Sequence, residues 1–138
     1  EIIEQLVITS LQPALEEYLN DLTAAITELK HKSAAYGDIQ GIGIGAPNAN
    51  YYTGSIEFAP NITWCRDANG EPGVVNLAEL LSERTGLPVS ITNDANAAAM
   101  GEMAYGVAKG LKNFIMITLG TGVGSGIVIN GEVVAIQR

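Results

Sequence analysis

The stretch VSITNDANAAAMGE, residues 89–102, joins a short apolar segment to an alanine-rich one. The first four residues have strand-forming character, and the alanines after Asn96 favour a helix. Asn93 suits the N-cap position, where its side chain would accept a hydrogen bond from the N–H of Asn96, and Asp94 suits the positive end of the helix. A carboxylate at this position can also act in catalysis. On these residues alone, Asn93-Asp94 is either a helix cap or part of a reactive site.

Helical and strand patterns alternate along the first part of the chain. Apolar residues recur at helical spacing after Pro13, glycine alternates with isoleucine in IQGIGIGAP, and Gly86 and Pro88 separate a second helix from a strand. The patterns predict helices at about 14–32, 75–85 and 93–105, and strands at about 39–47 and 88–92. Glu4–Ser10 also has the composition of a short strand. This alternation predicts an α/β fold with parallel strands.

The chain changes character after about residue 110. FIMITL at 114–119 and an apolar run at about 125–129 flank a glycine-rich turn, and Asn130-Gly131 leads into a third strand. Asn-Gly between apolar runs is the strongest short signal for a β-hairpin. We therefore expect a second sheet to begin here. Because unpaired apolar strands invite pairing with another copy, we also expect a homo-oligomer.

Four glycines alternate in LGTGVGSG, at positions 120, 122, 124 and 126. No Gly-Lys-Ser/Thr follows them, and Ser125 stands where a dinucleotide-binding fingerprint needs its third glycine. Bare backbone N–H groups on a tight bend can hold phosphate oxygens, with the Thr121 hydroxyl as a further donor. The other interpretation is a hairpin whose glycines allow close packing on a neighbouring helix. The spacing leaves both interpretations open.

The composition excludes several classes of site and partner. The formal net charge is −8 and no run of lysine or arginine occurs, which argues against a nucleic-acid or anionic-membrane surface. One cysteine and one histidine cannot form a disulfide within the chain or a Cys/His metal cluster. We therefore expect a reducing, cytoplasmic compartment. No apolar run is long enough to cross a bilayer.

Three motifs, in this chain order, resemble the ROK family of repressors, open reading frames and kinases, and most closely its bacterial glucokinases. They are IEFAPNITW at 56–64, TNDANAAAMGE at 92–102 and LGTGVGSGIVINGEVV at 119–134, and the likeness runs from about Ile39 to Val134. The resemblance implies the actin-like ATPase (ribonuclease H-like) fold, with two α/β domains that close on a cleft. It implies transfer of the γ-phosphoryl group of ATP, with Mg²⁺, to a hexose, with glucose and its 6-hydroxyl as the expected acceptor.

The resemblance also assigns residues to the sugar site. Asp94 would be the general base that accepts the proton of the attacking sugar hydroxyl. Asn93 would contact sugar hydroxyls, and Asn61 would lie in a loop beside the sugar. Pro47 and Asn48 would line the same pocket. Amide and carboxylate side chains suit these roles because they donate to and accept from hydroxyl groups.

On the nucleotide side, the resemblance places Gly120, Thr121 and Gly122 at the ATP phosphates and assigns no metal ligand. Three family segments are missing from the sequence: an early Asp-x-Gly-Gly-Thr, a later Glu-x-Gly-His and a Cys-x-Cys zinc segment. Residues 1–109 would form the sugar-binding domain without its first phosphate-loop hairpin, and 110–138 would begin the second ATPase domain. We therefore expect a fragment or truncation that is inactive alone. The alternative is a non-catalytic ROK-type sugar-sensing or interaction module.

Two further side chains are better explained by structure than by chemistry. Glu102 lies eight residues after Asp94, about 12 Å along a helix axis, which is too far for a carboxylate pair that acts on one bond. Trp64 is expected to pack in the core rather than to stack on a sugar.

Overall fold

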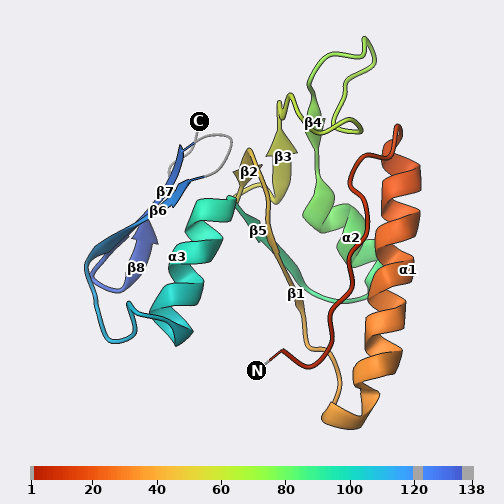
Figure 1. Cartoon of the computed structure of the whole chain (residues 1–138). Coiled ribbons are helices and arrows are strands. Elements are labelled where there is room, and N and C mark those ends of the chain that lie inside the picture. The colour runs from red at the N-terminus through yellow and green to blue at the C-terminus, as the bar shows by residue number, and fades with distance from the viewer. Residues whose placement is uncertain (1, 120–122, 135–138) are drawn as a thin grey trace.

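The computed structural model describes residues 2–119 and 123–134. The long helix at one side of the molecule is α1 (Leu15–Ser33), which confirms the helix predicted at about 14–32 (Figure 1). Its first turn is acidic and its last turn basic, as the helix dipole favours. A short 3₁₀ turn, Ala34–Tyr36, follows it.

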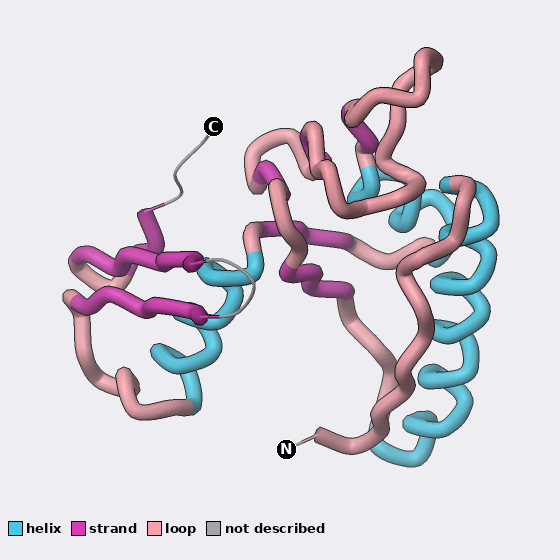
Figure 2. Tube along the Cα trace, turned by 45° about the horizontal axis from the view of Figure 1, so that its top comes forward, coloured by secondary structure: helices cyan, strands magenta, loops and turns pink. Residues whose placement is uncertain are grey.

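The segment before α1 is not a strand. Residues 2–10 contain neither helix nor strand, so the strand predicted at Glu4–Ser10 is wrong. This segment runs alongside α1 (Figure 2). The Trp64 indole donates a hydrogen bond to the Ser10 carbonyl (3.1 Å), and the Thr63 hydroxyl donates to the Gln12 carbonyl (2.7 Å). Because side chains rather than a strand edge bind these carbonyls, the strand propensity of the segment is not realised.

Two parallel strands form the centre of the first part of the fold. They are β1 (Ile42–Gly45) and β5 (Val89–Thr92), with Ile42 opposite Val89. The hydrogen-bonded ladder extends past their ends, since the Ala46 N–H donates to the Thr92 carbonyl at 3.0 Å. The chain reaches β5 through α2 (Leu77–Thr85). The predicted parallel α/β arrangement is confirmed.

A small antiparallel sheet lies at the carboxyl ends of this pair (Figure 1). It contains β2 (Ala49–Asn50), β3 (Ser55–Glu57) and β4 (Val74–Val75), in that order. The sequence predicted a helix from about residue 75, but α2 begins at Leu77. Val75 instead pairs with Ile56, which an isolated helical pattern cannot reveal.

The core joins α1, the small sheet and the parallel pair. Its fully buried members include Leu19 of α1, Ile56 of β3 and Ile91 of β5. Trp64 is 5% exposed and its ring stacks on Tyr18 at 4.3 Å, so the prediction that it packs in the core is confirmed. Buried and stacked in this way, Trp64 ties the loop after β3 to α1.

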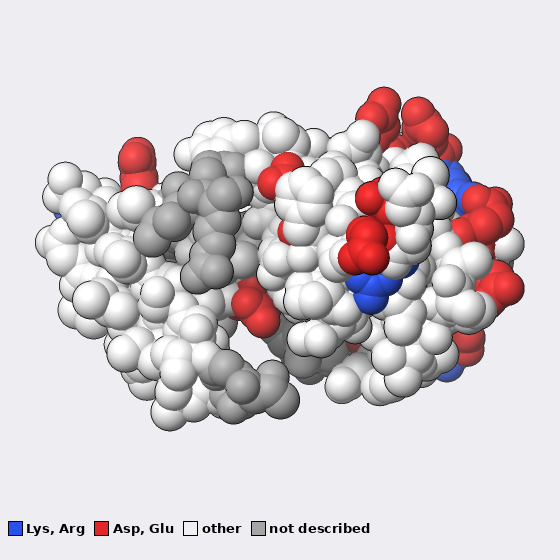
Figure 3. All heavy atoms as spheres, turned by 90° about the horizontal axis from the view of Figure 1, so that it is seen from above, with Lys and Arg blue, Asp and Glu red and all other residues white. Residues whose placement is uncertain are grey.

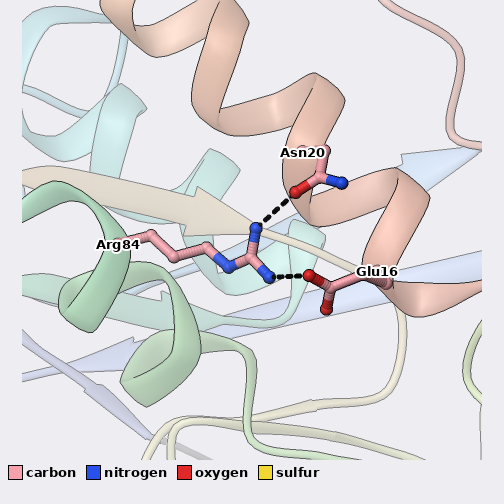
Figure 4. A network of polar contacts seen from close by, with 3 residues as sticks. All are labelled: Glu16, Asn20 and Arg84. Atoms are coloured by element: carbon pink, nitrogen blue, oxygen red, sulfur yellow. Dashed lines mark hydrogen bonds and ion pairs between the residues drawn. The ribbon is translucent and has the colours of Figure 1, made fainter.

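An exposed polar clamp joins the two outer helices (Figure 4). The Arg84 guanidinium of α2 donates to the Glu16 carboxylate and to the Asn20 side-chain oxygen of α1, both at 2.7 Å. The Glu16 side chain is 73% exposed, so solvent screens the ion pair and its stabilising effect is small.

The last part of the chain adds an antiparallel sheet. Its strands are β6 (Phe114–Leu119), β7 (Val123–Ile129) and β8 (Glu132–Val134). The Asn130-Gly131 turn between β7 and β8 has φ of 53° and 79°, as an Asn-Gly hairpin requires. The predicted hairpin and third strand are confirmed, although β7 begins two residues earlier than expected.

One helix, α3 (Asp94–Tyr105), lies between the parallel pair and this last sheet. Gly126 of β7 is buried against it: a Cβ added there would lie 2.8 Å from the Ala95 carbonyl oxygen and 2.9 Å from the Ala99 Cβ. A Cβ at Gly124 would lie 2.6 Å from the Thr118 Oγ1 of β6 and 3.1 Å from the Ala95 Cβ. Close packing on a helix therefore accounts for these two glycines of the alternating set.

The opposite face of the last sheet is apolar and open. Alternation along the strands places its exposed side chains on the side away from α3. The large apolar ones are Ile115, Ile117, Leu119, Val123, Ile129 and Val134, and Ser125 and Glu132 are also exposed on this face. Among the described residues, no helix combines the length and apolar character needed to cross a membrane.

Candidate functional site

The start of α3 is organised by Asn93. This residue is extended, with φ of −66° and ψ of 157°, and its Oδ1 accepts a hydrogen bond from the Asn96 N–H at 2.7 Å. The cap predicted from the sequence is therefore confirmed. Asn96 is buried, so the bond satisfies a backbone donor in a region that water reaches poorly.

Asp94 occupies the first turn of α3 and is exposed. Its Oδ1 accepts from the N–H of the next residue, Ala95, at 2.9 Å. This contact joins sequence neighbours and does not connect the carboxylate to another element of the fold. Since Asn93 already caps the helix, the fold makes little use of the Asp94 side chain.

The backbone around Asp94 is held by close packing on β1. A Cβ added at Gly45 would lie 3.6 Å from the Asp94 Cα and 2.9 Å from the Ala97 Cβ, so glycine is what allows α3 to approach the end of β1. The Ala46–Thr92 hydrogen bond then holds the chain that leads into the next loop. The carboxyl ends of β1 and β5 and the start of α3 thus meet at one end of the molecule (Figure 1).

The loop after β1 contains two of the predicted sugar-site residues. Pro47 and Asn48 are both exposed, and Asn48 has a left-handed φ of 55° that asparagine tolerates better than most residues. The Asn48 Nδ2 donates to the carbonyls of Glu57 (3.1 Å) and Phe58 (3.3 Å). Its amide group therefore joins this loop to the end of β3, and its Oδ1 is the atom that can face a ligand.

The loop after β3 contains Asn61, which is exposed. The loop is held in place, because the Arg66 guanidinium donates to the Pro60 carbonyl at 2.8 Å and Ala59 is buried. Asn61 thus stands on a loop that is tied to the core. In Figure 3, which views the molecule from above, acidic side chains dominate the charged surface.

The structure describes only part of the predicted nucleotide site. Gly120, Thr121 and Gly122 lie outside the described residues. The flanking strands are described, and Leu119 pairs with Val123. Within residues 2–119 and 123–134, no three His, Cys, Asp or Glu side chains form a metal-binding group. Mg²⁺ in phosphoryl-transfer sites is usually held by one or two carboxylates together with substrate phosphates and water, so such a group is not required.

Sequence reasoning missed two features of this end of the molecule. The Glu57 Oε1 accepts hydrogen bonds from the Ser55 hydroxyl (2.9 Å) and the Asn50 side-chain amide (3.2 Å), and so stabilises the β2–β3 turn. Phe58 is a bulky residue with a left-handed φ of 55°. No sequence pattern marks either feature, because Glu57 depends on the turn between β2 and β3, and Phe58 on a hydrogen bond from its N–H to the Gly73 carbonyl.

Comparison with known proteins gives the family. The ROK family profile matches residues 4–135. A glucokinase of Halalkalibacterium halodurans is 44% identical over 129 residues, which are 93% of this chain and 34% of that protein. The chain therefore spans about a third of the length of this relative.

Two solved structures have the same architecture. A ROK family glucokinase from Streptomyces griseus, in complex with glucose and AMPPNP, is 36% identical, with a TM-score of 0.66 over 88% of this chain and 36% of that one. A ROK family transcriptional regulator, a homologue of the E. coli MLC protein, is 27% identical, with a TM-score of 0.72 over 89% of this chain and 30% of that one. The expected actin-like ATPase fold is confirmed. This chain belongs to the ROK family.

Proposed function

We propose that this chain is the sugar-binding part of an ATP-dependent hexose kinase that phosphorylates glucose at its 6-hydroxyl. The observation that carries the proposal is the exposed Asp94 carboxylate at the start of α3, beside a cap that Asn93 already provides. The fold holds the backbone there by close packing at Gly45 but leaves the carboxylate free for a partner. A general base requires a carboxylate that is held in position and is not engaged by other groups of the fold.

The proposed chemistry is phosphoryl transfer, which depends on positioning and charge neutralisation more than on covalent help. Asp94 accepts the proton of the sugar hydroxyl while the hydroxyl oxygen bonds to the γ-phosphorus of ATP, the bond from that phosphorus to the β–γ bridging oxygen breaks, and ADP leaves. Asn93 and Asn61 bind sugar hydroxyls, and Pro47 and Asn48 close the pocket. Because its two amide hydrogens point to backbone carbonyls, Asn48 contributes an acceptor and a rigid loop.

The nucleotide is proposed to bind at Gly120, Thr121 and Gly122, through backbone N–H groups and a hydroxyl. Mg²⁺, when bound, would neutralise the phosphate charge. The glucokinase crystallised with glucose and AMPPNP supports a sugar and an adenine nucleotide as the ligand pair.

Residues 1–109 are proposed to belong to the sugar-binding domain, and residues 110–138 to begin the second domain. The separate β6–β8 sheet supports this division, although α3 packs on both parts. The open apolar face of that sheet supports a homo-oligomer. The net charge of −8 argues against nucleic acid or a membrane surface as the partner of this segment. A single cysteine supports a reducing, cytoplasmic compartment.

A non-catalytic sugar sensor is the second candidate, favoured by the likeness to a ROK transcriptional regulator. The two candidates differ in one measurable step. Both bind a hexose, but only the kinase converts it in the presence of ATP.

The test is hexose phosphorylation by the longest polypeptide in which this segment is encoded, with and without Asp94→Asn. We expect turnover to fall by about two to four orders of magnitude, the usual contribution of a positioned base. The free energy of unfolding should change by at most about 1 kcal/mol, since the carboxylate interacts mainly with the helix dipole. Sugar affinity should change much less than turnover.

Glu102→Gln is the matched control, because it removes a carboxylate from the same helix. The Glu102 Oε2 accepts from the Val107 N–H at 2.9 Å at the other end of α3, so this variant should keep parental turnover. If Asp94→Asn keeps parental turnover, or if it unfolds the protein, then Asp94 is a structural residue and the general-base assignment is wrong. Sugar binding without turnover in the parent would favour the sensor.

A further inference from the structure

Phe58 has a backbone conformation that its side chain does not favour. Its φ of 55° is left-handed, which is a genuine outlier for a bulky residue, whereas glycine adopts it without steric cost. Two hydrogen bonds hold it there. The Phe58 N–H donates to the Gly73 carbonyl at 2.7 Å, and its carbonyl accepts from the Asn48 Nδ2 at 3.3 Å. The backbone at this position therefore gives no reason for phenylalanine.

Core packing gives no reason for it either. The Phe58 side chain is 61% exposed, although Ile56 and Ala59 on either side of it are each 1% exposed. The chain thus turns an aromatic ring out to solvent between two core residues. Strained residues persist where the surrounding structure imposes them, and they gather at ligand sites.

The position of Phe58 identifies the site concerned. Asn48, which binds its carbonyl, and Asn61, three residues further along, are both assigned to the sugar pocket above. Asp94 begins α3 just after β5, and the Ala46–Thr92 hydrogen bond joins the end of β5 to the chain that leads into the Asn48 loop. The exposed ring therefore stands in the loop between two proposed sugar contacts.

We infer that Phe58 is a specificity-determining residue, whose ring packs against the C–H face of a bound hexopyranose. This inference rests on the proposed function, because it concerns the same sugar pocket. The face of an aromatic ring carries partial negative charge and attracts the weakly positive C–H bonds of a sugar. In β-glucopyranose all ring hydroxyls are equatorial and both faces of the ring present C–H bonds, whereas the axial 4-hydroxyl of galactose directs an oxygen to one face. The Phe58 ring packs on the face to which that hydroxyl points, so that Phe58 favours glucose over galactose.

The test is equilibrium binding of glucose and of galactose, its axial epimer, by calorimetry without nucleotide. Phe58→Gly removes the ring and suits the backbone, so the fold should be kept. We expect the Kd for glucose to rise about tenfold and the preference for glucose over galactose to shrink. Phe58→Tyr keeps the ring and should bind both sugars as the parent does.

Thermal unfolding of the same variants separates ligand contact from packing. Phe58→Gly should melt at or above the temperature of the parent, because the left-handed backbone is relieved. A clear fall in its melting temperature, or parental binding of both sugars, would overturn the inference alone. A parent that binds no hexose would overturn the proposed function together with it. A parent that binds glucose but does not phosphorylate it would overturn only the kinase assignment, and the Phe58 variants would still decide this inference.

Discussion

Replacing Gly126 by alanine is expected to disturb the contact between α3 and the β6–β8 sheet. The added Cβ would lie 2.9 Å from the Ala99 Cβ, whereas two carbon atoms attract best at about 3.5–4.0 Å. The shortfall is therefore at least about 0.6 Å. The Cβ would also lie 2.8 Å from the Ala95 carbonyl oxygen. Neither atom can rotate away, so α3 or β7 must move.

The magnitude follows from two opposing effects. Overpacking a well-packed contact costs about 1–3 kcal/mol. Glycine to alanine also restricts the unfolded chain, which stabilises the fold by about 0.4–1 kcal/mol. We therefore expect a net loss of about 1–2 kcal/mol in the free energy of unfolding.

The assay is urea unfolding followed by circular dichroism and by the fluorescence of Trp64, the one tryptophan of the chain. Gly101→Ala is the control, because Gly101 lies in α3 and a Cβ there would meet nothing within 4 Å. Alanine in place of a helical glycine should stabilise by about 0.5–1 kcal/mol. If Gly126→Ala is as stable as Gly101→Ala, the close packing of β7 on α3 is refuted.

Three further changes test other parts of the fold. Asn93→Ala removes the cap of α3 and should cost about 1 kcal/mol in urea unfolding, whereas Asn93→Ser should keep most of that stability; equal losses would contradict the cap. Arg84→Met breaks the exposed clamp between α1 and α2 and should cost less than about 1 kcal/mol, with a smaller effect in high salt. Burial raises the pKa of the Tyr18 hydroxyl above its ordinary value near 10, so its contribution to stability is complete below about pH 10 and is lost as the pH rises through the raised pKa. Tyr18→Phe should remove that alkaline loss, and an unchanged pH profile would show that Tyr18 is not its source.

The open face of the β6–β8 sheet predicts self-association of the 138-residue chain. Exposed apolar side chains on paired strands favour burial against a second copy. Sedimentation at rising protein concentration should show a growing average mass. Ile117→Lys, on the exposed face, should reduce it, and a monomer at all concentrations would contradict the prediction.

Local signals predicted the elements whose causes lie within a few residues. The helical spacing after Pro13 predicted α1, and the Asn-Gly turn predicted the β7–β8 hairpin. Asn93 was identified as a cap because the capping bond to Asn96 spans only three residues. Each of these interactions is short-range, so the sequence contains the information needed to predict it.

Pairing with distant segments decided the features that the sequence left open or misassigned. The Glu4–Ser10 segment has strand-forming residues, but Trp64 binds the carbonyl of its last residue, Ser10, and Thr63 binds the Gln12 carbonyl that follows. Val75 was assigned to a helix and instead pairs with Ile56. Strand propensity measures the fit to a neighbouring surface, and that surface is absent from a local window of sequence.

The candidate site divides in the same way. The sequence by itself determined that Asn93 caps a helix that begins with Asp94, and its three motifs identified the family. Only the tertiary structure decided that Gly45 and Gly126 hold α3 by close contact from two sides, that Asn48 anchors the end of β3, and that Phe58 is turned out to solvent. These facts depend on which atoms a glycine or an amide meets after the sheets have paired. Residue type and spacing do not contain that information, because the partners lie far away along the chain.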